Sequence, residues 1–488
     1  MMSLDALARA CGARLRGDGS VPVGAITHRA QSAGAGTVFA AVPGRHHHGL
    51  EFLADALGAG AVAVLSDRDP GPGVAWLKTA APRRAMALAA WALAGTPQHR
   101  LRLVGITGTN GKTTVADLIA RIARAAGERP GVFGTISYSL PERTVDAVRT
   151  TPEATDLAPL LGELVAQDGT IAVMEVASIA LTQERVAGLE FDVAVWTNLT
   201  RDHLDLHGDM ETYFAAKAGL AGLLRRDPPG RRVIGIDDAM IRRLAATPRP
   251  GDVTFGTAKD ALVRANDVHA SLTGTVFSLV TPAGSVTVSL PLIGRHNLEN
   301  ALAAAAAAFA LGWNLDTIAT ALGAAAPVAG RLEPVDIGRP CQVFVDYAHT
   351  PDALQQVLLA IRELAPERRL IVVFGCGGDK DTGKRAPMGE IVARIADVPI
   401  VTSDNPRSED PQAIIDEVLI GVQRVGNPRI LAIADRREAI AAALAVADDH
   451  SVIILAGKGH EQEQIFADHT VPFDDRVVVC ELARRRRG

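Results

Sequence analysis

Cysteine and aromatic residues are scarce in this sequence. Its 488 residues include four cysteines, and Phe, Trp and Tyr together make up 4%. The cysteines at positions 11, 341, 376 and 480 lie too far apart in sequence for a disulfide framework or a closely spaced metal-ligand pair, so we expect a reducing, cytoplasmic location. Alanine carries much of the 48% hydrophobic content, and the composition is that of a globular protein without extensive disorder.

Long hydrophobic runs and an excess of positive charge are also missing. The longest apolar run, Ala301 to Trp313, is shorter than the roughly 20 residues of a transmembrane helix. Asp5, Arg9 and Arg14 interrupt the start of the chain, which therefore does not resemble a secretory signal. The formal net charge of -5 gives no general attraction to nucleic acid or anionic lipid, and the basic tail at 484–487 is short. We expect neither a nucleic-acid partner nor membrane insertion.

The chain is too long for one hydrophobic core, and its pattern predicts an α/β protein of three domains. From position 101 onward, short apolar runs alternate with helical patterns, and polar or glycine-rich motifs follow the runs, as in βαβ units. We predict a smaller N-terminal α/β unit at 1–99, a central parallel-sheet domain at 100–328 and a Rossmann-like doubly wound domain at 329–488. The expected strands are 101–106, 171–175, 191–196 and 232–236, then 341–346, 369–374, 398–402 and 451–455, with a helix at 352–364 and another beginning near Asn300.

A phosphate-binding loop follows the first strand of the central domain and opens a helix. Its glycines let backbone N–H groups surround a phosphate, Lys112 can reach the terminal phosphates, and Thr113 can ligate magnesium. The strict spacing would place a glycine at position 106, but Ile106 stands there, so the loop is a variant. Its members are Gly108, Thr109, Asn110, Gly111, Lys112, Thr113 and Thr114.

Ionisable residues also follow two further strands. Glu175 ends an apolar strand, where a carboxylate suits a magnesium ion better than packing, although a salt-bridged surface glutamate is the ordinary alternative. The polar loop at 197–208 contains His203, a candidate metal ligand. Lys217 lies on the next helix and, unmodified, would ordinarily pair with a carboxylate.

These motifs together resemble the Mur ligases, the amide-forming enzymes of peptidoglycan precursor synthesis. The resemblance covers nearly the whole chain in order. It continues through Gly294 to Asn300, Gly330 to Glu333, Val345 to Pro351 and Phe374 to Asp379. It implies ATP as co-substrate, Mg²⁺ as cofactor and a carbamate on Lys217. The implied metal ligands are Thr113, Glu175, His203 and carbamylated Lys217, the implied catalytic residues are Lys112, Glu175, His203 and Lys217, and the implied further ATP contacts are Asn297, Asn300, Arg331 and His349.

The C-terminal domain carries the implied specificity for meso-diaminopimelate. The segment at 404–407 resembles the motif by which the third-position ligase of this family recognises that amino acid. Arg407 could grip its extra carboxylate with two parallel hydrogen bonds. Gly457 and Glu461 resemble a second contact to the distal ammonium, with a structural turn as the alternative, and Lys380 stands where an arginine is usual. The implied contacts are Lys380, Asp404, Asn405, Pro406, Arg407, Gly457 and Glu461.

The nucleotide-sugar side departs further from the family pattern. The usual Asp-Ser-Arg segment is degenerate around 29–31, Ala177 replaces a serine, and Gly235 replaces an asparagine. The N-terminal domain is nevertheless expected to hold UDP, with histidines in its loop that are too close in sequence to share one metal ion. The implied contacts to the UDP-muramoyl dipeptide are Arg45, His46, His47, Thr150, Thr151, Gln183 and Arg185.

The implied reaction adds meso-diaminopimelate to the D-glutamate γ-carboxylate of UDP-N-acetylmuramoyl-L-alanyl-D-glutamate through an acyl phosphate. All substrates are small molecules, and a monomer that closes its third domain before chemistry is expected. A lysine-adding ligase and a degenerate nucleotide-binding protein without ligase activity stay open as alternatives. Folylpolyglutamate synthases share the central fold but have no reason to carry the motif at 404–407.

Overall fold

The N-terminal unit is built on a five-stranded sheet in the order β2-β7-β6-β5-β4. The computed structural model describes residues 1–44, 47–326 and 329–485. Strands β4 to β7 are parallel, and β2 is antiparallel to β7. The elements of this unit are β1 (Met2–Ser3), α1 (Leu4–Cys11), β2 (Arg14–Arg16), β3 (Pro22–Val23), β4 (Ala25–Thr27), β5 (Thr37–Ala40), α2 (Leu53–Gly58), β6 (Ala61–Ser66), β7 (Trp76–Lys78) and α3 (Pro82–Leu93).

The central sheet has eleven strands in the order β11-β10-β9-β12-β8-β13-β14-β15-β16-β17-β18. We predicted a parallel sheet, and the middle strands β9, β12, β8, β13, β14, β15 and β16 are parallel. At the two edges, β10 and β11 on one side and β17 and β18 on the other pair antiparallel to their neighbours. Its strands are β8 (Arg102–Thr107), β9 (Pro130–Phe133), β10 (Ser137–Ser139), β11 (Thr144–Asp146), β12 (Ile171–Glu175), β13 (Val193–Trp196), β14 (Arg231–Gly235), β15 (Val253–Gly256), β16 (Val263–Ser271), β17 (Gly274–Thr281) and β18 (Gly284–Leu290).

Helices cover both faces of this sheet, which explains why its middle strands are continuous apolar runs. In β13, Ala194 and Trp196 join the core under α5, whereas Val193 and Val195 join the core under α4, α10 and α11. Alanine lets α10 pack closely beneath the sheet. The helices of this unit are α4 (Lys112–Ala125), α5 (Ala154–Ala166), α6 (Ser178–Thr182), α7 (Leu204–His207), α8 (Met210–Ala218), α9 (Ala239–Arg242), α10 (Arg295–Ala310) and α11 (Leu315–Gly323).

The predicted helix start near Asn300 is wrong. Helix α10 begins at Arg295, because Gly294 with φ 92° turns the extended chain into the helix. Asn297 and Asn300, which interrupt the apolar pattern, are buried on its first turns. Their polar side chains concealed the first turns of the helix from the sequence pattern.

The C-terminal unit is doubly wound around a six-stranded sheet, β19-β20-β24-β21-β22-β23, in which only β19 is antiparallel. Helices α12 to α14 cover one face, and α15 and α16 cover the other. Its elements are β19 (Glu333–Val335), β20 (Gln342–Asp346), α12 (Pro351–Leu364), β21 (Arg369–Phe374), α13 (Arg385–Ile395), β22 (Val398–Val401), α14 (Pro411–Val425), β23 (Leu431–Ala432), α15 (Arg436–Val446), β24 (Ser451–Ala456), β25 (Glu463–Ile465), β26 (Thr470–Pro472) and α16 (Asp475–Arg485).

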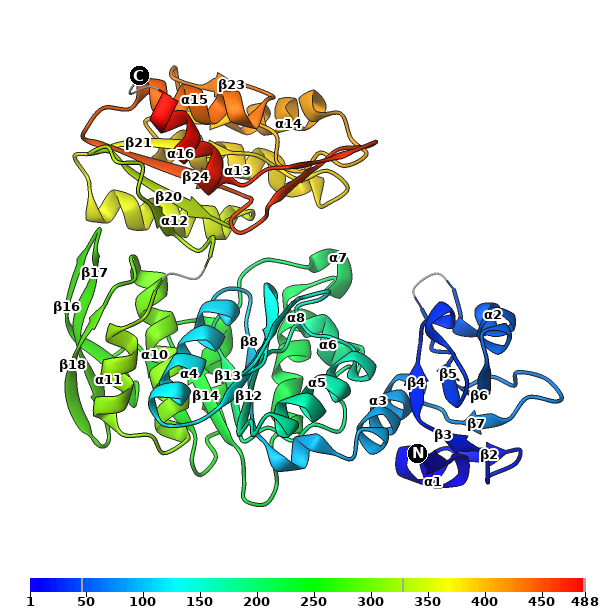
Figure 1. Cartoon of the computed structure of the whole chain (residues 1–488). Coiled ribbons are helices and arrows are strands. Elements are labelled where there is room, and N and C mark those ends of the chain that lie inside the picture. Colours follow the sequence, from blue (N-terminus) through cyan, green and yellow to red (C-terminus); the bar gives the residue numbers. More distant parts are fainter. Residues whose placement is uncertain (45–46, 327–328, 486–488) are drawn as a thin grey trace.

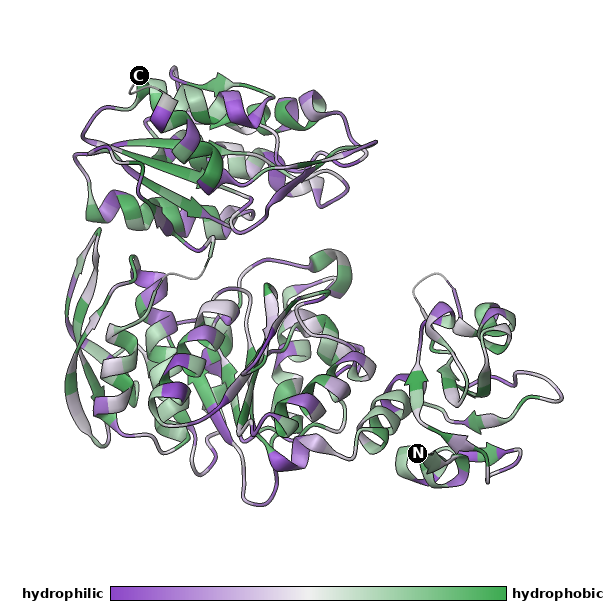
Figure 2. Cartoon of the chain, viewed as in Figure 1, coloured by the Kyte–Doolittle hydropathy of each residue, from purple (hydrophilic) through white to green (hydrophobic). Residues whose placement is uncertain are grey.

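The C-terminal unit lies over the carboxyl ends of the central parallel strands, whereas the N-terminal unit lies beside the central unit, where α3 packs against α5. In Figure 1 the C-terminal unit lies above the central unit, with α12 facing it, while α3 leads from the blue N-terminal unit into the central unit. Leu272, at the tip of the β16–β17 hairpin, packs against the C-terminal core. Hydrophobic residues concentrate in the strands in Figure 2. Among the described residues, no helix has the length and apolar content needed to cross a membrane.

A buried ion pair joins the last two helices and gives a test of the C-terminal core. Both Arg436 and Asp475 side chains are 0% exposed and form two hydrogen bonds of 2.8 and 2.6 Å. Replacing Asp475 by Ala should lower the free energy of unfolding by about 3–5 kcal/mol, because it leaves a buried guanidinium without its carboxylate. Urea unfolding followed by circular dichroism measures this loss.

The neighbouring pair Arg437–Glu481 is the matched control, since its side chains are 36% and 50% exposed. Glu481→Ala should cost at most about 1 kcal/mol. Equal losses in the two variants would contradict this account of the buried pair.

Candidate active site

The phosphate loop lies between β8 and α4 and is shaped by two glycines. Gly108 and Gly111 have φ of 155° and 87°. A Cβ on Gly108 would lie 1.9 Å from the Thr197 hydroxyl oxygen, and one on Gly111 would lie 2.2 Å from Oδ1 of Asn300. Neither position accepts a side chain, so the loop backbone stays open to a ligand.

Two lysine amines meet at the carbonyl oxygen of Gly108. Lys112 Nζ donates to it over 2.9 Å and Lys217 Nζ over 2.7 Å. Burial lowers the pKa of Lys112, with the negative charges of Glu175 and Asp202 partly opposing this. The pKa of Lys217 falls well below its ordinary value, first through burial and then through repulsion by Lys112. Both effects disfavour the charged form of the Lys217 amine.

Lys217 does not form the ordinary ion pair that its sequence context allowed. Its residue is 2% exposed, and among the side chains that the structure describes, which do not include that of Asp205, no carboxylate lies within salt-bridge distance of its amine. Its amine sits 4.5 Å over the ring of Tyr213, in a recess of about 40 Å³ that Lys112, Ser178 and His203 also line. This recess leaves room beside the amine for a small added group.

Glu175 is buried at the end of β12, so the alternative of a salt-bridged surface glutamate is wrong. The residue is 1% exposed. Its Oε1 accepts hydrogen bonds from the Thr113 hydroxyl at 2.8 Å and the Thr135 backbone at 2.9 Å, and Oε2 accepts one from the Thr135 hydroxyl at 3.0 Å. A carboxylate and a hydroxyl in contact beside a phosphate loop are a fitting pair of oxygen ligands for Mg²⁺.

His203 approaches the same recess from the loop after β13. It precedes α7 with φ 54°, and its Nε2 lies 3.4 Å from Oδ2 of Asp202. The described residues contain no group of three His, Cys, Asp or Glu side chains that could hold a metal ion. The predicted metal ligands include two residues of these types, Glu175 and His203. The further oxygen ligands would have to come from Thr113, a modified Lys217 and the nucleotide phosphates.

Tyr213 is a site residue that the sequence reasoning missed. Its hydroxyl lies 3.3 Å from Oγ1 of Thr109, and its ring supports the Lys217 amine. Burial raises the pKa of Tyr213 to about 12, so the phenol stays protonated. The available signal was spacing, because Tyr213 precedes Lys217 by one helical turn and shares its face of α8.

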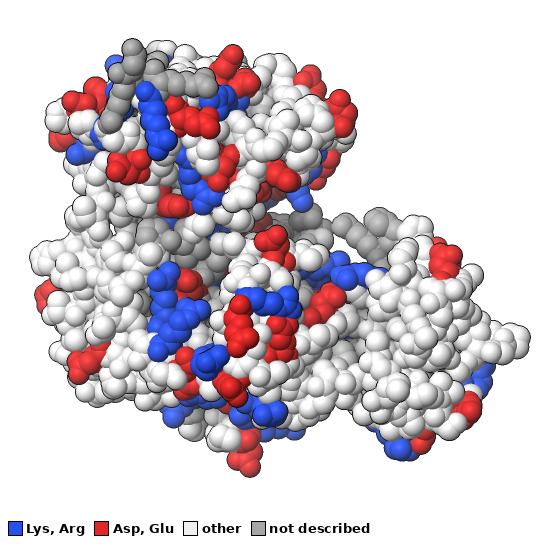
Figure 3. Space-filling view, in the orientation of Figure 1, with Lys and Arg blue, Asp and Glu red and all other residues white. Residues whose placement is uncertain are grey.

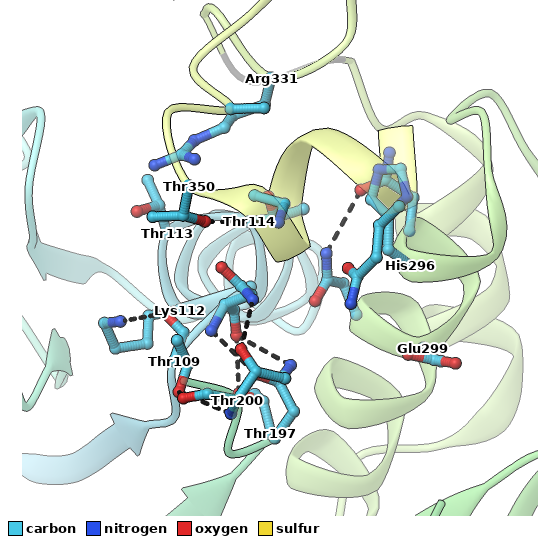
Figure 4. A pocket seen from close by; sticks show the side chains of 18 of the residues that line it. Thr109, Lys112, Thr113, Thr114, Thr197, Thr200, His296, Glu299, Arg331 and Thr350 are labelled. Carbon is cyan, nitrogen blue, oxygen red and sulfur yellow. Dashed lines mark hydrogen bonds between the residues drawn. The ribbon is translucent and has the colours of Figure 1, made fainter. Parts of the chain in front are cut away.

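A cleft of about 500 Å³ separates the phosphate loop from the C-terminal unit. Figure 4 shows Arg331 and Thr350 entering it opposite Lys112 and Thr109. Burial lowers the pKa of His349, whose Nδ1 lies 2.8 Å from the Tyr347 carbonyl oxygen. The structure brings all predicted ATP residues except Gly108 to the cleft wall, namely Thr109, Asn110, Gly111, Lys112, Thr113, Thr114, Asn297, Asn300, Arg331 and His349.

The two segments predicted to bind the amino acid lie together in the C-terminal unit. Asn405 donates from Nδ2 to Oε2 of Glu461 over 2.7 Å, and Lys458 donates to the same carboxylate over 3.2 Å. Arg407 has φ 54° and donates from its guanidinium to the Gly378 carbonyl over 2.8 Å. Asp404 and Pro406 are buried, and Gly457 packs against the Asp404 carboxylate, whereas Lys380 lies on an exposed turn.

The predicted sugar-nucleotide residues divide between two places. Thr150 lines the cleft, Thr151 donates to the Glu175 carbonyl over 2.8 Å, and Gln183 accepts two hydrogen bonds from Arg185. His47 belongs to the N-terminal unit, where it is exposed and lies 2.8 Å from Glu51. Arg45 and His46 fall outside the described residues.

Gly235 departs from the family pattern for a structural reason. A Cβ at this position would lie 2.5 Å from the Thr197 carbonyl oxygen and 3.0 Å from the Phe255 ring. The cleft wall therefore has no space for the asparagine that is usual there. Ala177, the other departure, lines the cleft and donates its backbone N–H to the Thr151 hydroxyl over 3.0 Å.

Comparison with known proteins matches both large units to one family. Residues 106–308 match the Mur ligase middle domain, and residues 330–459 match the Mur ligase, glutamate ligase domain. The chain belongs to the Mur ligase family. Mur ligases are ATP-dependent enzymes that form amide bonds, so this chain is a ligase of that kind. A lack of enzymatic activity, left open by the sequence, is not favoured.

Individual Mur ligases cover almost the whole chain. A Solibacter usitatus protein named UDP-N-acetylmuramoyl-L-alanyl-D-glutamate--2,6-diaminopimelate ligase is 45% identical over 92% of this chain and 91% of its own length. The Streptomyces coelicolor protein of the same name is 41% identical over 96% of this chain and 94% of its own length. A solved structure of that name is 33% identical, with a TM-score of 0.71, covering 100% of this chain and 99% of that one.

A hydrogen bond across the cleft of this Mur ligase gives a test of domain docking. Asn110 in the phosphate loop donates from Nδ2 to Oδ2 of Asp352 in α12 over 3.0 Å. Asp352→Ala removes a bond to a charged acceptor, typically about 1.5–3 kcal/mol, so a more open arrangement should gain population. Small-angle X-ray scattering should then show a larger radius of gyration.

Glu363→Ala is the control for this experiment, because Glu363 is exposed near the far end of the same helix. Its scattering profile should match that of the unsubstituted protein. Identical profiles for all three proteins would refute a contribution of Asp352 to docking.

Proposed function

We propose that this chain adds meso-diaminopimelate to the D-glutamate γ-carboxylate of UDP-N-acetylmuramoyl-L-alanyl-D-glutamate. The observation that carries the proposal is the pairing of Asn405 with Glu461 beside Arg407, at 2.7 Å, in the unit that faces the phosphate loop. Diaminopimelate has a second carboxylate and a second ammonium, for which the Arg407 guanidinium and the Glu461 carboxylate are partners of opposite charge. Two relatives that cover the chain bear the name of this reaction.

The reaction needs an activated acyl group, which ATP provides. The γ-carboxylate attacks the γ-phosphorus and expels ADP, giving an acyl phosphate; the amine of diaminopimelate then attacks the acyl carbon and expels phosphate, losing its proton to solvent. Lys112 and the loop N–H groups bind the transferring phosphoryl group, and Arg331 and His349 approach it from the C-terminal unit. Bound Mg²⁺ would neutralise phosphate charge beside Thr113, Glu175, His203 and Lys217.

The Lys217 amine is proposed to be a carbamate in the working enzyme. Its depressed pKa supplies the neutral amine that attacks CO₂, releasing one proton. The product carries a negative charge in place of a positive one. Repulsion with Lys112 thereby becomes attraction, and a further oxygen ligand is created for a metal ion.

The remaining proposals concern organisation. We place the domain boundaries at 1–99, 100–328 and 329–488. The N-terminal domain would hold UDP, with His47 on its exposed loop beside Glu51. The enzyme would act in the cytoplasm as a monomer, on small-molecule substrates alone.

Substitution of Arg407 tests the amino-acid specificity. Arg407→Gln should reduce kcat/KM for meso-diaminopimelate about hundredfold, as expected when one partner of a buried charge pair is removed, and should leave lysine turnover within about threefold. Arg429→Gln, an exposed arginine of the same unit, is the matched control. Mass spectrometry of the product distinguishes the tripeptides, and unchanged selectivity in Arg407→Gln would favour the lysine-adding alternative.

Isotope labelling tests the carbamate. With ¹³C-bicarbonate, the protein should show a carbamate resonance that is absent from Lys217→Arg and retained in Lys259→Arg, a change at an exposed lysine. The signal should weaken as pH falls through the lowered pKa of Lys217, because protonation removes the nucleophile. A resonance of equal strength in Lys217→Arg would disprove the assignment.

A further inference from the structure

Three arginine side chains lie around one buried carboxylate at the junction of the N-terminal and central units. Glu153, which precedes α5, is 3% exposed. Its Oε1 lies 3.0 Å from Nε of Arg185, 3.7 Å from NH1 of Arg83 and 3.9 Å from NH1 of Arg149. The three guanidiniums come from α3, from the loop before Thr150 and from the segment after α6. We call Glu153 and these three residues the arginine cluster.

The arginine cluster is not balanced by the carboxylates around it. Two further carboxylates pair with arginines nearby: Asp156 binds Arg29 through contacts of 3.1 and 3.3 Å, and Glu184 lies 3.6 Å from Arg84. Five guanidiniums thus face three carboxylates, an excess of two positive charges among these residues. Burial lowers the pKa of nearby His28, which disfavours the charged form of its ring.

Hydrogen bonds in the arginine cluster are also incomplete. Arg185 is well held, since it donates to the Thr151 carbonyl over 3.1 Å and to Gln183 over 2.6 Å. Arg83 and Arg149 approach Glu153 only at ion-pair distance, beyond a normal hydrogen bond. Glu153 Oε2 is buried and has no hydrogen-bond partner among the described residues. That oxygen is a spare acceptor, whereas the spare donors are the guanidinium N–H groups of Arg83 and Arg149, which make no hydrogen bond to the residues that the structure describes.

One member of the arginine cluster is adjacent in sequence to a residue that lines the reaction cleft. Arg149 precedes Thr150, which lines the cleft and whose hydroxyl oxygen lies 3.1 Å from that of Thr135, a hydrogen-bond donor to Glu175. On the face seen in Figure 3, Lys and Arg side chains lie where the N-terminal and central units meet, with Asp and Glu side chains beside them. A ligand whose reactive carboxylate lies at the phosphate loop can extend toward this junction.

We infer that Arg83 and Arg149, gathered with Arg185 by the positioning residue Glu153, bind a second anionic group of the nucleotide-linked substrate. The inference rests on the proposed function and adds to it two arginines and a carboxylate that the sequence did not single out. The group is an unreacted carboxylate or phosphate; the free α-carboxylate of the terminal D-glutamate and the diphosphate both have this chemistry. Bidentate binding by arginine suits either one.

Steady-state kinetics with two substrates tests the inference. Arg83→Gln and Arg149→Gln should each raise KM for the nucleotide-linked dipeptide about tenfold, the loss expected for one charged hydrogen bond, with kcat and KM for ATP unchanged. The second substrate carries an amide in place of the α-carboxylate. If the cluster binds the α-carboxylate, the substitutions should add little to the KM of the amide analogue. If it binds the diphosphate, they should raise the KM of the dipeptide and the KM of the amide analogue alike.

Arg84→Gln is the matched control, because Arg84 is the next residue on α3 and instead pairs with Glu184 at 3.6 Å. It should leave KM unchanged. Glu153→Gln should raise the same KM, and Glu153→Asp should recover part of the loss, since it keeps the charge. Thermal melting checks that each variant is folded.

Three results would overturn the inference: unchanged KM in Arg83→Gln and Arg149→Gln, an equal rise in KM for ATP, or the same rise in Arg84→Gln. Failure of the proposed function gives a different result. In that case the unsubstituted protein forms no tripeptide from ATP, the nucleotide-linked dipeptide and meso-diaminopimelate.

Discussion

The active site depends on two lysine amines that share one carbonyl oxygen. Lys112 and Lys217 both donate to the Gly108 carbonyl oxygen, at 2.9 and 2.7 Å, and Lys217 is 2% exposed. Two ammonium ions this close would repel each other strongly, and the pKa of Lys217 falls well below its ordinary value. This fits the proposed division of roles, in which Lys112 is the cation for phosphate and Lys217 carries the carbamate.

The rest of the cleft adds a carboxylate and side chains from the C-terminal unit to this pair of amines. Glu175 brings negative charge from the end of β12, and the C-terminal unit brings Arg331 and His349 across the cleft. Their positions depend on docking, in which Asn110 contacts Asp352 and Leu272 packs on the C-terminal core. Because the residues proposed to bind the nucleotide and the amino acid belong to different units, the proposed site is complete only when these units are together.

Sequence alone predicted those parts of the structure that repeat a local pattern. The strands at 171–175 and 369–374 were located to the residue, because helices bury both faces and leave an uninterrupted apolar run. The antiparallel strands β17 and β18 were missed, since they lie at a sheet edge where exposed polar residues dilute the pattern. The reason for Gly235 was also hidden, because the atoms that exclude a side chain, Thr197 and Phe255, are remote in sequence.

The arginine cluster has the same origin in tertiary structure, and it bears on how the enzyme selects its acyl substrate. Arg83, Arg149 and Arg185 are separated by whole secondary-structure elements and meet only because α3 and α5 pack together. A carboxylate alone at the phosphate loop would leave two positive charges at the junction without an anion. A substrate with one anionic group at the phosphate loop and another at the arginine cluster neutralises the positive charge at both places. The distance between the loop and the cluster therefore discriminates against simple monocarboxylic acids. Selection of this kind acts before phosphoryl transfer and needs no contact with the reacting carbon.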